Sequence, residues 1–323
     1  MLSVHHDITI GSTQFKSGSN SRLIALESDA TIGVPINNCR MTFTVPADLS
    51  FTEGDDVTVK VGYKDELSTI FTGIVRSIEW DIGSVTIEAH SVFQQIAALR
   101  THAYFENAFV GDIVKSLASE TDVGIGTVQS GARFAFFAVG SNQSVWQYIQ
   151  DLATKCGVDF FANKDDKLVF GLPLSFELPT ILQFGINLLS CHIETSVSNL
   201  KGIEVYGESP ASLGQGPESS SWFTKKEVKG SAGDNNNVRR IYEPAARAQE
   251  TAALFATGLW QGFKVKKKGI LTLLGKADLE IGQLVMVSSM PSDSQNGMYK
   301  IVAVRHQIKK DKGFITILNV LGE

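Results

Sequence analysis

The sequence contains little cysteine and no long apolar segment. Three cysteines among 323 residues form no CxxC pair, which predicts buried thiols and no disulfide framework. These cysteines are Cys39, Cys156 and Cys191. The longest apolar runs, at residues 134–140 and 178–182, are far shorter than the roughly 20 residues that span a bilayer. We therefore expect no membrane insertion by this chain.

The chain also lacks a secretory signal and an excess of positive charge. Residues 1–7 contain neither a basic n-region nor an apolar h-region, so we expect the protein to start in the cytoplasm. Lysine and arginine together number 29 against 34 aspartates and glutamates, which gives a net charge of −5. A protein that grips nucleic-acid phosphates needs a basic face. DNA is therefore expected to pass nearby without being held.

No motif for metal binding, nucleotide binding or catalysis occurs. No histidine has a second potential ligand three or four residues away on a predicted helix, the spacing that zinc sites use. The histidines are His5, His6, His90, His102, His192 and His306. A P-loop, a G-x-S-x-G elbow and a G-x-G-x-x-G turn after a strand are all missing. We predict no catalytic, cofactor-binding or metal-ligating residue and no cofactor. A pair of acids that only folding brings together stays open.

Residues 1–90 predict a first small antiparallel β-barrel or sandwich. Apolar and polar residues alternate at 41–45, 57–61 and 85–89. This period of two is typical of strands that bury one face. It predicts that Val59 points inward.

Residues 91–190 predict an α+β middle domain, because the apolar spacing changes to about 3.6 residues. Ser91-Val-Phe-Gln94 has the form of a capping box, which marks the start of a helix. An apolar stripe then predicts a second helix that begins at Val110.

A third helix and a hairpin follow in the same domain. Ser144-Val-Trp-Gln147 is another capping box, and the apolar stripe after it stops at Gly157. Two apolar runs at 158–162 and 168–170 are separated by a polar turn. They predict a β-hairpin.

Residues 191–323 predict a second β-barrel domain that carries an insertion. The stretch at about 208–240 is rich in Ser, Gly, Asn and Pro and predicts a mobile insertion. Pro244 then opens an alanine-rich helix expected over about 244–260. Strands return from Phe263 onward, and Val285 is expected to point inward.

The two ends of the sequence resemble each other, which predicts an internal duplication. Residues 41–43, 53–59 and 85–87 are similar to residues 271–273, 280–287 and 315–317. The spacing from Thr42 to Ile87 equals the spacing from Thr272 to Ile317, which is 45 residues in each case. The expected fold class is therefore α+β and mainly β, with two similar antiparallel β-barrel domains flanking a helix-containing middle region.

Residues 143–170 resemble the helix-hairpin signature of phage late control gene D proteins, a family of tail baseplate hubs. Three further stretches, at 71–91, 110–118 and 246–285, fit the same family in the same order, so the resemblance covers roughly residues 35–322. The family includes the N-terminal hub half of the valine-glycine repeat spike proteins of type VI secretion, in which the chain continues into a spike. Here the sequence ends after the second barrel, so the spike is expected to be a separate polypeptide.

The resemblance implies a structural baseplate hub without enzymatic activity. It implies a homotrimer that forms a pseudo-six-fold ring, joins a hexameric tail tube or tube-initiator protein to a separate trimeric central spike protein, and lines the axial channel. Baseplate wedge proteins are further expected partners, and DNA or effector cargo passes only in transit. The expected location is the baseplate of a virion tail or injection particle, assembled in the host cytoplasm.

Two alternatives stay open at this point. A tail-associated peptidoglycan hydrolase would need a catalytic acid pair or Cys/His pair in a cleft. A hub of a secretion system or extracellular injection particle would share every sequence feature of a phage hub.

Overall fold

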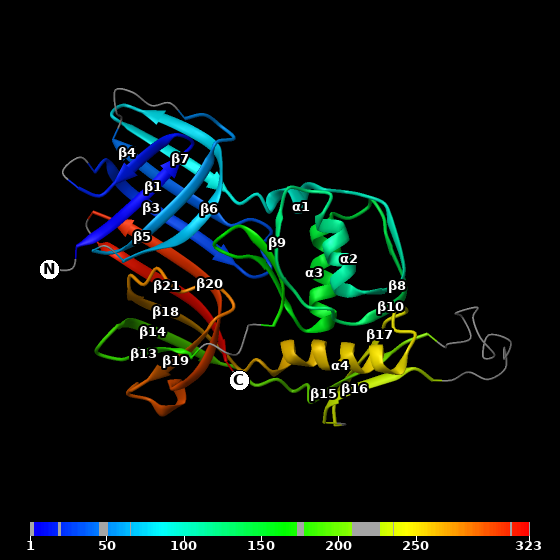
Figure 1. The fold of residues 1–323 in the computed structure, drawn as a ribbon. Helices are drawn as coiled ribbons and strands as arrows, with labels where there is room; N and C mark the ends of the chain where they lie inside the picture. Colours follow the sequence, from blue (N-terminus) through cyan, green and yellow to red (C-terminus); the bar gives the residue numbers. More distant parts are fainter. Residues whose placement is uncertain are drawn as a thin grey trace.

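The chain folds around three apolar cores, which belong to a first β-unit, a middle region and a second β-unit (Figure 1). The computed structural model describes residues 3–18, 21–44, 51–64, 66–172, 178–208, 227–234, 236–310 and 312–322. Within these ranges the fold is α+β and mainly β, as the sequence predicts. None of the helices in these ranges is both long and apolar enough to cross a bilayer.

The first β-unit is an antiparallel arrangement of strands that curls around its own core. Its strands are β1 Val4–Ile10, β2 Thr13–Lys16, β3 Leu23–Thr31, β4 Asn38–Thr44, β5 Asp56–Tyr63, β6 Glu66–Asp81 and β7 Ser84–His90. Val57, Val59 and Val61 of β5 are fully buried. The intervening Thr58 and Lys60 face outward, as a period of two requires.

The second β-unit repeats this arrangement at the other end of the chain. Its strands are β13 Thr180–Gln183, β14 Leu188–Thr195, β18 Lys267–Leu274, β19 Leu284–Ser288, β20 Gly297–Lys309 and β21 Gly313–Gly322, with a 3-10 helix at Asp293–Gln295. The spatial order is β3-β4-β7-β6-β5-β1 in the first unit and β14-β18-β21-β20-β19-β13 in the second. The predicted duplication is therefore present in the fold.

Two irregularities in the strands coincide between the two units, whereas the register shift after Val59 in β5 has no counterpart in the second unit. The pairing register shifts after Leu23 in β3 and after Leu188 in β14. It shifts again after Val75 in β6 and after Ile301 in β20. Bulges bend a strand at a defined position, so these matches fix which residues of the two units are equivalent. One strand differs in direction, because β1 pairs with β5 antiparallel whereas β13 pairs with β19 parallel.

In one of the three matched stretches, at residues 85–87, the equivalent positions differ by one residue from those read off the sequence. Met41 lies opposite Ile87 in the first unit, and Leu271 lies opposite Leu318 in the second. The equivalent of Ile87 is therefore Leu318 and not Ile317. Successive side chains of a strand point to opposite faces, and Leu318 is the fully buried one. The equal spacing of 45 residues does not mark equivalent positions.

The two units form one continuous sheet, since β3 pairs antiparallel with β20. Among the described residues, no strand pairing joins the two ends of either unit. In the first unit, the edge of β3 that closure would use is occupied by β20. Ala277 and Phe314 of the second unit fill the seam there and pack in the first unit's core.

The middle region packs three helices against short strands. Its elements are α1 Gln94–Ala98, β8 Ala103–Phe109, α2 Val110–Ala118, β9 Gly124–Val128, β10 Arg133–Val139, α3 Val145–Cys156, β11 Asp159–Ala162 and β12 Lys167–Gly171. The capping box at Ser144 is confirmed, as is the left-handed end of α3 at Gly157. The capping box expected at Ser91 is absent, because Ser91 Oγ instead accepts a hydrogen bond from the backbone N–H of Asn37.

A long insertion in the second β-unit belongs to the middle core. Between β14 and β18 the chain forms β15 Gly202–Tyr206, β16 Lys229–Gly233, β17 Val238–Tyr242 and α4 Gln249–Lys264. Phe255 of α4 is buried in the same core as α2 and α3. The sequence expectation placed this helix at 244–260 within the second barrel domain, but its apolar face finds its partners in the middle region. Part of the expected mobile insertion at 208–240 forms β16 and β17, and residues 209–226 and 235 lie outside the described residues.

Two contacts hold the insertion in place. Helix α4 crosses the end of α3 so closely that a Cβ on Gly258 would lie 2.4 Å from the carbonyl oxygen of Lys155, which only glycine permits. In the inserted sheet, the carboxylate of Glu204 accepts hydrogen bonds from Lys229 Nζ at 2.6 Å and from Arg240 Nε at 2.9 Å. These two cations lower the pKa of Glu204 to about 2.

Candidate functional site

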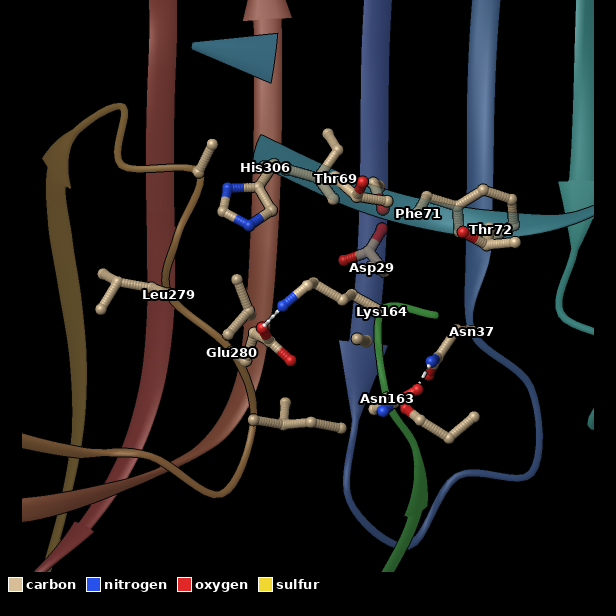
Figure 2. A pocket seen from close by; sticks show the side chains of 17 residues that line it. Asp29, Asn37, Thr69, Phe71, Thr72, Asn163, Lys164, Leu279, Glu280 and His306 are labelled. Carbon is tan, nitrogen blue, oxygen red and sulfur yellow. Dashed lines mark hydrogen bonds and ion pairs between the residues drawn. The ribbon is translucent and has the colours of Figure 1, made fainter. Parts of the chain in front are cut away.

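The hairpin formed by β11 and β12 lies where the two β-units meet (Figure 2). Its turn faces β3 of the first unit, β20 of the second unit and the loop that connects β18 to β19. The hairpin is part of the segment that carries the family resemblance. The segment whose sequence carries the resemblance therefore includes the hairpin that connects the middle region to the two β-units.

Polar contacts tie this hairpin to both units. Asn37 Nδ2 of the first unit donates a hydrogen bond to the carbonyl oxygen of Ala162 at 3.0 Å. Lys164 forms an ion pair with Glu280 of the second unit, and Figure 2 shows the two side chains reaching toward each other. Lys300 Nζ of β20 donates to Asp159 Oδ1 at 2.8 Å. The three contacts hold the hairpin against both units at once.

Asp166, in the turn of the hairpin, connects it to the start of α1. Its Oδ2 accepts a hydrogen bond from the backbone N–H of Val92 at 2.5 Å. Its Oδ1 is buried and has no hydrogen-bond partner among the described residues. Burial raises the pKa of Asp166 to about 6, although the backbone N–H groups of Val92 and Phe93 act in the opposite direction. The Asp166 carboxyl group is thus partly removed from water, and its hydrogen bond joins the hairpin turn to the segment that precedes α1.

His306 of β20 is buried between the two β-units. Its Nδ1 lies 3.1 Å from Thr316 Oγ1, and its ring lies 5.9 Å from the ring of Phe314. Burial lowers its pKa to about 4, so the imidazole is neutral at pH 7. The hydroxyl partner, Thr316, is fully buried, so this histidine–hydroxyl pair has no access to a substrate and serves packing.

The cavity at this junction is too small for a substrate. It has a volume of about 30 Å³, which is room for about one or two water molecules. Asp29 and Glu280 on its wall form ion pairs with Arg305 and Lys164. The residues at this junction therefore serve a structural role: their hydrogen bonds and ion pairs hold the hairpin and the two β-units together.

A larger hollow of about 350 Å³ lies beside the hairpin, between Phe161 and the loop that precedes β19. It contains two acids, Asp278 and Glu280, which are paired with Lys276 and Lys164. A glycosidase needs one acid that keeps its proton and a second that is ionised. Neither acid of this hollow is singled out for such a role, because each is held in an ion pair with a lysine. The described residues contain no group of three or more His, Cys, Asp or Glu side chains that would hold a metal ion.

The two β-units present different outward surfaces at equivalent positions. In the first unit, Thr9, Thr58 and Thr72 lie in one row across β1, β5 and β6. In the second unit, the row across β13, β19 and β20 consists of Ile181, Met286 and Met298. All three apolar side chains are exposed. The inward faces of the two units match, and the outward faces differ.

Sequence reasoning predicted no site residue and did not find the residues at the junction. These residues are Asn37, Asp159, Lys164, Asp166, Glu280 and Lys300. They come from three distant parts of the sequence, and each is a common polar residue in a turn or strand. The resemblance at 143–170 pointed to the hairpin but not to its partners.

The fold is that of known tail proteins. The structure matches the 43 kDa tail protein of prophage MuSo2 from Shewanella oneidensis with a TM-score of 0.70 at 14% identity, covering 98% of each chain. It matches the tail protein of Neisseria meningitidis MC58 with a TM-score of 0.71 at 13% identity, covering 99% of this chain and 97% of the other. No curated protein sequence matches the chain.

A secretion protein shares the same fold. The c3393 protein of E. coli, described as a component of the type VI secretion system with structural similarity to the T4 bacteriophage tail proteins gp27 and gp5, matches with a TM-score of 0.62 at 10% identity. The match covers 98% of this chain and 76% of the other. Residues 34–310 match the family described as the Alg8 N-terminal domain, and the chain belongs to that family.

Proposed function

We propose that this chain is a structural baseplate hub of a contractile phage tail or of a related contractile injection particle, and that it has no enzymatic activity. The observation that carries the proposal is the repetition of one β-unit at both ends of the chain, with both copies joined in a single sheet. The fold shared with phage tail proteins and with a type VI secretion component supports it. The resemblance of residues 143–170 to late control gene D proteins supports the same role.

A duplicated chain solves a symmetry problem at the end of a tail. A hexameric tube and a trimeric spike cannot make identical contacts, but three chains with two similar units each present six similar units to the tube. The same trimer offers three-fold features on its other side, because the outward surfaces of the two units differ. The shared strand order supports the six-fold role, because it gives the two units the same overall shape, and the unmatched outward rows support the three-fold role.

The proposed hub closes the tail tube, holds a separate central spike protein and lines the axial channel. Its partners are the tail tube or tube-initiator protein, the spike and the baseplate wedge proteins, and DNA or effector cargo passes through it in transit. It is assembled in the host cytoplasm and resides in the tail or particle baseplate. A net charge of −5 suits a channel wall along which polyanions pass without sticking.

Multi-angle light scattering of the purified protein tests the proposal. The expected species contains three chains of 35.0 kDa, about 105 kDa, either alone or, with the spike's own mass added, after addition of a candidate spike protein. A stable monomer in both conditions, together with digestion of purified peptidoglycan, would replace the hub with the hydrolase.

A further inference from the structure

Two strand edges in the sheet are unpaired where their equivalents are paired. Among the described residues, β18 is the only strand that pairs with β14, and the other edge of β14 carries a single isolated bridge, from Leu188 to Phe184, which leaves residues 190–195 open on that side. Residues 77–81 of β6 pair with β7 on one side only. Their equivalents in the other unit are β3 and residues 303–307 of β20, and these two pair with each other within the chain.

We infer that the free edge of β6 in one copy pairs antiparallel with the free edge of β14 in a second copy, in the manner in which β20 pairs with β3. The edge of β6 is equivalent to the edge of β20, and the edge of β14 is equivalent to the edge of β3. Within the chain β20 pairs with β3, so β6 and β14 can make the same contact only with other copies. An unpaired edge strand is a ready template for another strand. The inference rests on the proposed hub in taking the partner to be another copy of this chain.

Exposed apolar side chains at the end of β6 point to the same contact. Trp80 is 60% exposed and Ile82 is fully exposed. Their equivalents in the second unit are His306, which is 4% exposed, and Ile308, which packs against the first unit's core. Large apolar residues gathered at one projecting end mark a surface that a partner covers.

The pairing within the chain fixes the register between copies. His306 lies opposite Ser28, and Ile308 lies opposite Leu26. The equivalents of Ser28 and Leu26 in β14 are Ile193 and Cys191, because the strands share the bulge that follows Leu23 and Leu188. Trp80 of one copy is therefore placed opposite Ile193 of the next. Ile82 is placed opposite Cys191, which packs against the second unit's core.

One pair in this register consists of like charges. Arg305 lies opposite Asp29 and forms an ion pair with it, whereas the equivalent positions hold Glu79 and Glu194. Each glutamate has a cation beside it within its own chain. Arg40 lies 3.2 Å from Glu79, and Lys268 is the cross-strand neighbour of Glu194. The contact between copies is therefore weaker than the contact within the chain and is sensitive to charge.

Cysteine cross-linking tests both the pairing and its register. The backbone N–H of Ile32 donates to the carbonyl oxygen of Val302. Since backbone-bonded and non-bonded pairs alternate along an antiparallel ladder, Asp29 and Arg305 form a pair whose backbones do not hydrogen-bond to each other and whose Cβ atoms lie close together. Glu79 and Glu194 occupy the equivalent pair, and both are exposed. The variant that carries Glu79→Cys and Glu194→Cys is oxidised with diamide beside a slipped control that carries Glu79→Cys and Ser196→Cys. The unsubstituted protein measures any cross-linking by the native cysteines.

The expected result is covalent dimers and trimers from the first variant, formed many times faster than from the slipped control. Equal rates in the two variants would overturn the register. A light-scattering trimer in which neither variant cross-links would overturn the edge pairing and leave the proposed hub standing. A monomer in which neither cross-links would overturn both. As a second measurement, Trp80→Ala is expected to reduce the trimer fraction, whereas Tyr242→Ala, at an exposed aromatic position on β17, is expected to leave it unchanged.

Discussion

The two β-units have the same strand order and share two bulges, but only in the first is the edge of its first sheet strand, β3, covered by a strand of the other unit. Strand β20 covers the edge of β3, and Phe314 packs in the first unit's core. On the corresponding edge of the second unit, β14 pairs with no strand in the described part of the chain and makes a single bridge, from Leu188 to Phe184. The difference leaves one sheet edge per chain open, and this is the edge that the proposed ring would use between copies.

The largest expected effect comes from a charge placed in either core. Val59→Asp and Val285→Asp each put an unpaired carboxylate at a fully buried position and are expected to lower the free energy of unfolding by at least about 3–5 kcal/mol. Hydrogen exchange will show loss of protection centred on the first unit for Val59→Asp and on the second for Val285→Asp. The outward-facing control Thr58→Asp is expected to fold normally. Assembled particles with normal baseplates carrying either core variant would contradict the two-unit account.

His306, at the contact between the units, makes the fold sensitive to acid. Its folded-state pKa of about 4 lies below the unfolded value of 6.5, so the unfolded chain binds more protons between these values. The contribution is complete above pH 6.5 and is lost as the pH falls to 4, with a loss of up to about 3 kcal/mol. Urea unfolding of the protein and of His306→Gln at pH 7 and pH 4.5 measures this. Equal losses of stability in both proteins would show that His306 does not titrate as described.

Asp166 in the hairpin has a pH dependence of the opposite sign. Its folded-state pKa of about 6 lies above the ordinary value of 3.8, so the folded chain binds more protons, and its contribution to stability falls by up to about 3 kcal/mol as the pH rises from 4 to 6. Asn tolerates the positive φ of 56° at this position. Since His306 contributes with the opposite sign over this range, the two proteins are compared directly: the free energy of unfolding of Asp166→Asn, relative to that of the native protein, is expected to rise between pH 4 and pH 7. A fall in this difference would reverse the assignment.

Only the second β-unit carries an inserted helix, and one glycine tests how that helix is held. Gly258→Ala forces a Cβ to within 2.4 Å of the Lys155 carbonyl oxygen and is expected to destabilise the fold by about 1–3 kcal/mol. Gly262→Ala, on the same helix with open space around it, is expected to stabilise the helix by up to about 1 kcal/mol. Thermal unfolding of the two variants measures the difference. If both shift the melting temperature in the same direction, α4 does not rest on α3 as described.

The smallest expected effect is on association between copies. Glu79→Arg places a cation opposite Glu194 and is expected to strengthen trimer formation by about 1 kcal/mol, as Glu194→Arg is by itself. Combining the two restores like charges and is expected to return association to the native level or below. Sedimentation velocity at low salt measures the three variants. Additive strengthening in the double variant would contradict the register.

The sequence predicted well those features that depend on neighbouring residues. The capping box at Ser144, the end of α3 at Gly157 and the hairpin after it form as expected, because each is decided within a few residues. Features that depend on distant contacts were missed. Ser91 binds Asn37 instead of capping a helix, and α4 packs in the middle core although it lies within the sequence of the second unit.

The internal duplication was predicted correctly in one respect and incorrectly in another. Alternating valines and turn residues predicted two similar β-units, and the fold contains them. The equal spacing of Thr42 to Ile87 and Thr272 to Ile317 was one residue away from the structural equivalence. A period of two reveals the face of a strand but not its register against a distant partner. The residues at the junction were missed for the same reason, because Asn37, Asp159 and Lys300 meet only after the three cores pack together.

The central claim is that the two β-units occupy equivalent places in a ring. Electron microscopy of the purified oligomer, viewed along its axis, tests this most directly. If the two β-units are equivalent in the ring, the particle will have a three-fold axis, and six similar densities will surround a central channel, with the two units of each chain alternating. A ring in which only the first units surround the channel, or a particle without a three-fold axis, would contradict it.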